Sequence, residues 1–219
     1  MVKYWREFMI QSVNLTNDIF WLGILDPHLD VFDIIMETKY GTTYNSYLVQ
    51  TTEGAILVET VKEKFFDAYL QKIEEKIGDL NQIKYIITNH TEPDHAGSIG
   101  KLINRIPHLT VIGSKTAITY LKDILNIDFN YQTTEELKSF KLGNKTFEFI
   151  KAPFLHWPDS IYTYMPDEHV LFTCDSFGSH YSPKSGIKLS EVPQSEEAAY
   201  QDALLYYYTA IFSPFKPYV

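Results

Sequence analysis

The segment His90-Thr91-Glu92-Pro93-Asp94-His95 is the most informative stretch of this sequence, because it places four possible metal ligands within six residues. A short apolar run at Tyr85–Thr88 precedes the segment and predicts a buried strand. A helical pattern from about Gly97 to Ile106 follows it, and Pro107 ends that pattern. We therefore expect a polar loop at a strand-to-helix junction, and buried titratable clusters in such places mark functional sites.

The side chains of this loop are expected to converge. In an extended segment alternate side chains share a face, so His90, Glu92 and Asp94 would point the same way. Pro93 disfavours the helical region for Glu92 and so protects the extension. His95 would reach the same cavity from the start of the helix. This set of nitrogen and oxygen ligands suits two neighbouring metal ions with two ligands each. A solvated polar loop with two incidental histidines is the alternative.

Two further candidate ligands lie later in the chain. His156 stands in Phe154-Leu155-His156-Trp157-Pro158-Asp159-Ser160, at the end of an apolar stretch. Asp175 closes an apolar strand predicted over Val170–Cys174, where a carboxylate must be paired or bind a cation. With its two oxygens, Asp175 could bridge two ions about 3.5–4 Å apart. Taken singly, each of these two residues could instead be a capping or turn residue.

The remaining pattern predicts an α/β (or α+β) protein with helices outside two mixed β-sheets. Two β-rich runs, Tyr44–Gln50 and Ala55–Glu59, are expected to form a hairpin. Apolar residues recur at intervals of four across Lys62–Ile77 and predict a helix followed by a C-terminal glycine, Gly78. Later strands are expected at Thr110–Gly113, Lys145–Ile150, Ser160–Met165 and Val170–Cys174, and later helices after Ser114 and over Ser195–Phe212.

The composition is that of an ordinary globular protein and narrows the choice of partners. The 219 residues carry a formal net charge of −9, so we expect no nucleic-acid partner, because an acidic chain repels phosphate backbones. No apolar stretch approaches the roughly 20 residues that span a bilayer, and Met1–Asn14 does not resemble a signal peptide. The one cysteine, Cys174, fits a reducing compartment. We therefore expect no membrane association and a cytoplasmic location.

Together these motifs resemble one known family. The patterns His-x-Glu-x-Asp-His at 90–95, His-Trp-Pro-Asp-Ser at 156–160 and Cys-Asp-Ser-Phe-Gly-x-His at 174–180 are similar to the metallo-β-lactamase-like domain of the flavodiiron proteins, the oxygen and nitric oxide reductases. Gly41–Leu48 and Phe212–Val219 also resemble that family. The resemblance covers nearly the whole chain and implies an αββα sandwich. It is specific, because hydrolases of the same fold usually have His in place of Glu92.

The resemblance implies a particular set of iron ligands. His90, Glu92, His156 and Asp175 would hold one iron ion, and Asp94, His95 and the shared Asp175 would hold the other. No catalytic residue beyond these metal ligands is expected. Glu92 adds a hard anionic oxygen, which suits iron, whereas a histidine there would suit zinc. His180 falls near Asp175 and would orient a ligand from outside the metal shell; a surface histidine in a loop is the alternative reading.

The function implied by the resemblance is reductive. Two non-haem iron ions would bind O2 or NO, and electrons from FMN would convert O2 into water or NO into N2O. A rubredoxin or a flavin reductase type protein is the implied electron donor, and a head-to-tail homodimer is the implied assembly.

The sequence departs from the family pattern in two ways. The family supplies a further histidine after the final helix and then continues into a flavodoxin domain that carries FMN. We therefore expect residues 1–219 to be one metallo-β-lactamase-like diiron domain, incomplete at its C-terminus, without the flavodoxin domain and inactive in isolation. In addition, the region Asp30–Tyr40 carries Asp33 where the family often has a histidine.

Two other functions stay open. One is a hydrolase of the same fold, in which a metal-bound hydroxide attacks an ester, thioester or lactam. The other is an inactive truncated fragment that binds metal weakly.

Overall fold

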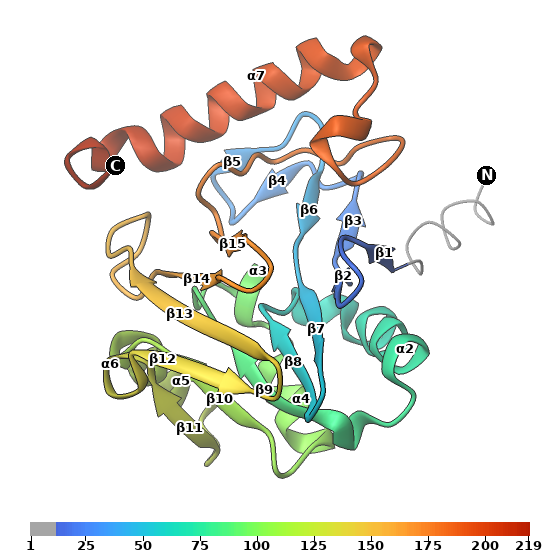
Figure 1. The fold of residues 1–219 in the computed structure, drawn as a ribbon. Helices are drawn as coiled ribbons and strands as arrows, with labels where there is room; N and C mark the ends of the chain where they lie inside the picture. Colours follow the sequence, from blue (N-terminus) through green and yellow to red (C-terminus); the bar gives the residue numbers. More distant parts are fainter. Residues whose placement is uncertain (1–11) are drawn as a thin grey trace.

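The computed structural model describes residues 12–219, so most of the segment considered for a signal peptide lies outside the described residues. A seven-stranded mixed sheet forms one layer, with the strand order β1-β2-β7-β8-β9-β10-β11 (Figure 1). Its strands are β1 (Val13–Asn14), β2 (Ile19–Trp21), β7 (Tyr47–Thr51), β8 (Gly54–Val58), β9 (Ile83–Ile87), β10 (Thr110–Gly113) and β11 (Asn130–Thr133). The predicted hairpin is confirmed, because β7 and β8 pair antiparallel. The strands from β8 to β11 run parallel.

A second sheet of four strands forms the other β layer. Its strands are β12 (Ser139–Leu142), β13 (Lys145–Lys151), β14 (Ile161–Met165) and β15 (Val170–Phe172). All three of its pairs are antiparallel, so the prediction of two mixed sheets is correct only for the larger one. Hairpin connections explain the difference, because short turns join antiparallel neighbours. Two small ribbons complete the strands: β3 (Ile24–Asp26) with β6 (Thr42–Tyr44), and β4 (Val31–Phe32) with β5 (Met36–Glu37).

The larger sheet is buried on both faces, and its side chains alternate between two cores. Leu57 and Ile86 point toward the helices, whereas their neighbours Ile56 and Ile87 point toward the smaller sheet. Phe147 of the smaller sheet is fully buried in this second core. The near-continuous apolar runs in the central strands therefore follow from burial on two sides.

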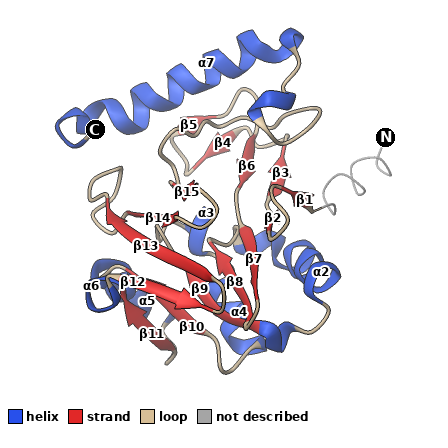
Figure 2. Ribbon diagram, in the orientation of Figure 1, coloured by secondary structure: helices blue, strands red, loops and turns tan. Residues whose placement is uncertain are grey.

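The helices are arranged around this sandwich as Figure 2 shows. They are α2 (Phe66–Ile77), α3 (Pro93–Ala96), α4 (Ile99–Arg105), α5 (Lys115–Leu125), α6 (Thr134–Leu137) and α7 (Glu197–Tyr207). Short 3-10 turns cover Glu63–Phe65, Leu80–Gln82, Leu189–Glu191 and Gln194–Glu196. The predicted termini of two helices are confirmed: Ser114 accepts a hydrogen bond from the Ala117 amide at the start of α5, and Gly78 follows α2 with a φ of 74°.

The C-terminal helix differs from its prediction. α7 ends at Tyr207, and the chain continues as a π-helical turn at Tyr208–Phe212 and a 3-10 turn at Ser213–Tyr218. This helical segment crosses one end of the molecule, above the β4–β5 ribbon (Figure 1). Within residues 12–219, no helix is long and apolar enough to cross a membrane.

Candidate metal centre

The loop after β9 and the first turn of α3 carry four of the predicted ligands. Glu92 has φ −60° and ψ 147°, an extended conformation, and Pro93 opens α3. The predicted extended conformation is therefore confirmed for Glu92. It is wrong for Asp94, which lies inside the first helical turn. Proline is favoured at the first position of a helix, where its missing N–H costs nothing. The turn directs Asp94 and His95 away from the first pair.

The first donor set gathers around Asp175 Oδ2. His90 Nε2 lies 3.2 Å from Glu92 Oε2 and 3.5 Å from Asp175 Oδ2. His156 Nε2 lies 3.2 Å and 3.3 Å from the same two oxygens. His156 comes from the loop between β13 and β14, and Asp175 follows β15, so the smaller sheet supplies half of this set.

The second donor set uses the other oxygen of the same aspartate. His95 Nε2 lies 3.1 Å from Asp175 Oδ1 and 3.3 Å from Asp94 Oδ2. Each set of donor atoms lies within 4.8 Å of one another, with Asp175 in both. The structure thus brings all six predicted ligands together, four around one point and three around another.

The spacing of these atoms fits bound metal ions. Donors about 2.1 Å from an ion lie about 3.0–3.4 Å from each other in octahedral or tetrahedral geometry. Five of the six observed separations, 3.1–3.3 Å, lie within that range, and the sixth, between His90 Nε2 and Asp175 Oδ2, is 3.5 Å. Moreover, Asp94 Oδ1 is buried without a hydrogen-bond partner among the described residues. Buried carboxylate oxygens without partners are costly, and a cation removes that cost.

Neighbouring carboxylates raise the pKa of two histidines of the first donor set. Burial alone would lower the pKa of His90, but hydrogen bonds with Asp159 and Glu92 raise it to about 10. Burial would likewise lower the pKa of His156, and hydrogen bonds with Asp175 and Glu92 raise it to about 9. Because metal ligands must be deprotonated, an ion entering this site displaces these protons.

Three residues that the sequence analysis did not assign support the donor sets from outside. Glu59 directly follows β8, and its Oε2 lies 2.7 Å from His95 Nδ1. Asp159 Oδ2 lies 3.2 Å from His90 Nδ1. The Tyr207 hydroxyl donates to Asp175 Oδ1 at 2.8 Å. A buried carboxylate that closes an apolar strand was the signal used for Asp175, and it would also have identified Glu59.

His180 is buried beside the site without touching a predicted ligand in any contact recorded for it. Its Nδ1 lies 2.9 Å from the Thr42 hydroxyl, and its ring packs against Phe32 and Tyr207. Burial lowers the pKa of His180 to about 4, so the ring is neutral at pH 7. Tyr207, which packs against the His180 ring, donates a hydrogen bond to Asp175.

Asp33, which occupies the region where the family often has histidine, lies at the edge of the first donor set. Its carboxylate pairs with Lys62 Nζ at 3.1 Å. Burial and a hydrogen bond with Glu92 raise the pKa of Asp33. Asp33 therefore connects the half-buried ammonium group of Lys62 to Glu92, a predicted ligand.

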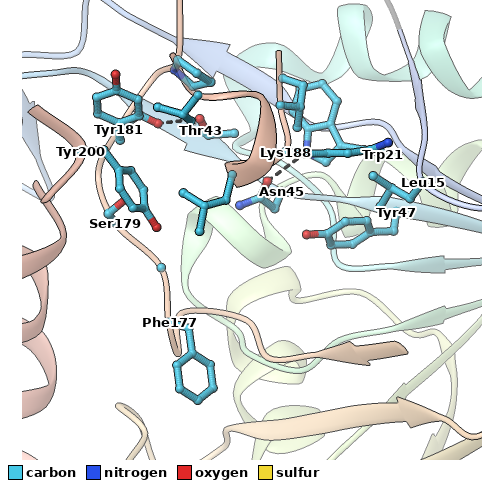
Figure 3. Close-up of a pocket in the computed structure, with 15 residues that line it drawn as sticks. Leu15, Trp21, Thr43, Asn45, Tyr47, Phe177, Ser179, Tyr181, Lys188 and Tyr200 are labelled. Atoms are coloured by element: carbon cyan, nitrogen blue, oxygen red, sulfur yellow. Dashed lines mark hydrogen bonds between the residues drawn. The ribbon is translucent and has the colours of Figure 1, made fainter. Parts of the chain in front are cut away.

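Two cavities lie near this end of the molecule. An apolar one of about 490 Å³ is bordered by α7 and includes Tyr207 and Phe212, which also pack around the donor sets. Figure 3 shows another of about 290 Å³, where Trp21 donates a hydrogen bond to Asn45 and Tyr200 faces them across the opening. None of the six predicted ligands lines either cavity.

Comparison with known proteins agrees with this geometry. A family model described as "ODP family beta lactamase" matches residues 42–203. A flavo-diiron protein of Clostridium acetobutylicum is 41% identical over 95% of this chain, and a nitric oxide reductase of Moorella thermoacetica is 36% identical over 95% of it. The solved structure of a rubredoxin oxygen:oxidoreductase from Desulfovibrio gigas superposes on 94% of the chain with a TM-score of 0.85 at 28% identity, covering 50% of that structure.

Fold and donor sets together define the class of the molecule: a mixed α/β domain of the metallo-β-lactamase type with paired histidine and carboxylate donors. Within that class, the chain belongs to the flavodiiron protein family. It spans about half the length of the curated relatives that it matches, 51% in both cases above.

Proposed function

We propose that residues 1–219 form the diiron domain of an oxidoreductase that reduces O2 to water, NO to N2O, or both. One observation carries the proposal: the two oxygens of Asp175 face two different donor sets, Oδ2 facing His90 and His156 and Oδ1 facing His95. A carboxylate divided in this way suits a pair of ions a few ångströms apart. When bound, such an iron pair supplies electrons and adjacent binding positions for two small molecules.

The composition of the donor sets favours iron over zinc. Glu92, Asp94 and Asp175 place three carboxylates against three imidazoles, and hard anionic oxygens suit iron more than zinc. Glu92 stands where hydrolases of this fold usually carry histidine. The hydrolase alternative is therefore disfavoured, and the carboxylates would offset the growing positive charge as the ions are oxidised.

The residues of this chain hold the predicted ligands in place and keep water out of the site. His90 is fully buried, and Glu92, His95 and Asp175 are each less than 10% exposed. Phe212 and Tyr207 close the site from the C-terminal segment. A dry pocket strengthens the electrostatic hold on bound ions.

Electrons would come from FMN in a flavodoxin part of a longer protein. The relatives are about twice as long as this chain, which supports that division. The name of the Desulfovibrio structure supports rubredoxin as one class of donor, and a flavin reductase type protein is the other. We further propose a head-to-tail homodimer and a cytoplasmic location; the one cysteine, Cys174, supports the latter.

A single-turnover experiment tests the proposal without any flavin. The chain is loaded with Fe²⁺ under argon and mixed with NO, and N2O is measured by gas chromatography. Reduction of two NO by two electrons and two protons gives one N2O and one water, so one N2O is expected for every two oxidised ferrous ions. Loading with Zn²⁺ and a thioester assay serve as the comparison. Thioester turnover with Zn²⁺, together with no N2O from the ferrous protein, would favour the hydrolase.

A further inference from the structure

Both side-chain oxygens of Glu59, which follows β8, contact the segment Asn89–His95, which carries four of the predicted ligands. Oε1 accepts a hydrogen bond from the Asn89 amide, next to His90, and Oε2 lies 2.7 Å from His95 Nδ1. The second contact is close but oblique, and neither Oε2 nor Nδ1 has another hydrogen-bond partner among the described residues. Glu59 is 2% exposed and has a φ of 60°, which is uncommon for a residue with a side chain. The fold thus maintains a buried carboxylate behind this imidazole.

Asp159 makes the matching arrangement on the other side. Its Oδ2 accepts hydrogen bonds from the amide and the hydroxyl group of Thr91, both at 2.8 Å. The same carboxylate lies 3.2 Å from His90 Nδ1, and its residue is fully buried. Its own carbonyl accepts a hydrogen bond from Ser114 at 2.8 Å, which fixes the loop to the start of α5.

The two carboxylates therefore divide the donor sets between them. Each carboxylate contacts Nδ1 of one histidine, and each also accepts a hydrogen bond from a backbone amide of the loop that carries His90. A carboxylate accepts hydrogen bonds and donates none when ionised, so once a metal ion has displaced one proton from each imidazole, the proton that remains is held on Nδ1. Nε2 then keeps its lone pair, and in both histidines Nε2 is the atom that faces Asp175.

We propose that Glu59 and Asp159 are positioning residues, one for each metal, that fix the Nδ1–H tautomer of His95 and His90 and so present Nε2 to the ions. This inference rests on the proposed metal centre. It assigns Asp159 to the four-ligand set and Glu59 to the three-ligand set, and neither residue touches the ion itself.

Amide substitutions separate this role from simple packing. Glu59→Gln has nearly the same shape but offers one acceptor and one donor, while both of its neighbours, the Asn89 amide and His95 Nδ1–H, are donors. One of them must lose its acceptor, or the His95 proton must move to Nε2 and block metal binding. Asp159→Asn imposes the same conflict on His90, because Thr91 already occupies one acceptor oxygen with two donors.

The test uses Zn²⁺ as a diamagnetic probe that takes both imidazole and carboxylate ligands. Histidine-¹⁵N-labelled full chain is titrated with Zn²⁺, and long-range ¹H–¹⁵N spectra report which ring nitrogen of each histidine carries the proton and which binds metal. In the wild-type chain, His90 and His95 should bind through Nε2 and retain Nδ1–H. Asp159→Asn should weaken Zn²⁺ binding at His90 by 10–100-fold and Glu59→Gln should do so at His95, the range expected for partners of metal-bound histidines.

Matched controls are Glu63→Gln and Asp67→Asn, two exposed carboxylates of the next helical segment. They should leave both affinities unchanged. Thr91→Val, which removes only the hydroxyl contact to Asp159, keeps the test decisive if an amide variant fails to fold; it should weaken the His90 site several-fold and spare His95.

The outcomes separate the two proposals. Amide variants that fold and bind Zn²⁺ with wild-type affinity and tautomers, or that weaken both sites equally, would overturn the assignment of Glu59 and Asp159 while leaving the metal centre standing. Wild-type affinity at His90 in Thr91→Val would likewise count against Asp159. A wild-type chain that takes up no Zn²⁺ and no Fe²⁺ would overturn both the metal centre and this inference.

Discussion

The hydroxyl group of Tyr207 donates a hydrogen bond to Oδ1 of Asp175 across 2.8 Å, which joins the C-terminal helix to the carboxylate shared by both donor sets. Both residues are buried, and the tyrosine ring also packs against His180. Burial and the Asp175 charge hold the pKa of Tyr207 well above its usual range, so the hydroxyl group stays a donor. The helix is thereby anchored by the site that it covers.

Replacing Tyr207 with Phe should lower the free energy of unfolding of the metal-free chain by about 1–3 kcal/mol, the usual worth of a hydrogen bond to a charged group. The ring contacts with His180 and Phe212 would remain. Urea unfolding measures the change, and Tyr206→Phe, an exposed neighbour on α7, is the control. Equal stability of the two variants would mean that the hydrogen bond contributes nothing.

Replacing Glu92 with Ala should remove most of the metal from the first donor set, because it deletes a charged donor that faces two histidines. His180→Ala should retain nearly all of it, since His180 contacts Thr42 rather than a predicted ligand. Metal content after desalting, measured by mass spectrometry, distinguishes the two. Similar retention in both variants contradicts the ligand assignment.

The donor set around His90 should fill before the set around His95. The first offers four protein ligands among the described residues and the second offers three. Titration with ⁵⁷Fe²⁺ followed by Mössbauer spectroscopy should show one dominant iron environment at one equivalent and a second at two. Asp94→Asn should weaken only the later one. Simultaneous filling of two environments from the first addition is the contrary result.

Glu92→His should shift the metal preference from iron toward zinc, because it exchanges a hard oxygen donor for an imidazole. The measurement is the Zn:Fe ratio after equilibration with equal concentrations of both ions under argon, compared with wild type. An unchanged ratio would show that Glu92 does not set the choice of metal.

Lys72 should make stability depend on alkaline pH. Its Nζ is buried under the Trp21 ring and donates to the Gly23 carbonyl, and burial lowers the pKa of Lys72 to about 8. The unfolded chain holds this proton up to about pH 10.5, so between these values the lysine binds more protons in the unfolded state, and its own contribution to stability rises with pH. Below pH 8 the buried lysine stays charged in the folded state, which lowers the free energy of unfolding by at most about 3 kcal/mol.

Lys72→Met should therefore stabilise the protein at pH 7, by an amount that shrinks between pH 8 and 10. Thermal melts of the variant and the wild type across that range provide the test, with the exposed Lys64 changed to Met as the control. The difference between variant and wild type isolates Lys72, because the raised pKa values of His90 and His156 lower the stability of both proteins alike as the pH rises. A difference that stays constant from pH 8 to 10 argues against a lowered lysine pKa.

Local patterns predicted much of the fold because its central elements are local. The β7–β8 hairpin, α2 and the start of α5 follow from short-range periodicity and capping residues. The π-helical turn after Tyr207 depends on packing that no local pattern encodes.

The candidate ligands were recognisable because four of them lie within six residues and the others end apolar segments. Their division into two sets followed from the family resemblance and matches the grouping in the structure. The local pattern alone placed Asp94 on the same face as His90 and Glu92, which is wrong because a helix starts at Pro93. Tyr207 was missed for a different reason: it contacts Asp175 across 32 positions from a helix with no polar pattern. Asp159 was visible in its motif, but only the fold shows which histidine it contacts.

The origin of the donors has a consequence for the integrity of the whole domain. His90 and Glu92 follow a strand of the larger sheet, whereas His156 and Asp175 belong to loops of the smaller one. An ion held by all four residues would join the two sheets of the sandwich. At a free ion concentration of one hundred times its dissociation constant, it would raise the free energy of unfolding by about 2.7 kcal/mol. The cell's supply of metal would then govern how long each copy of the protein survives, quite apart from what it catalyses.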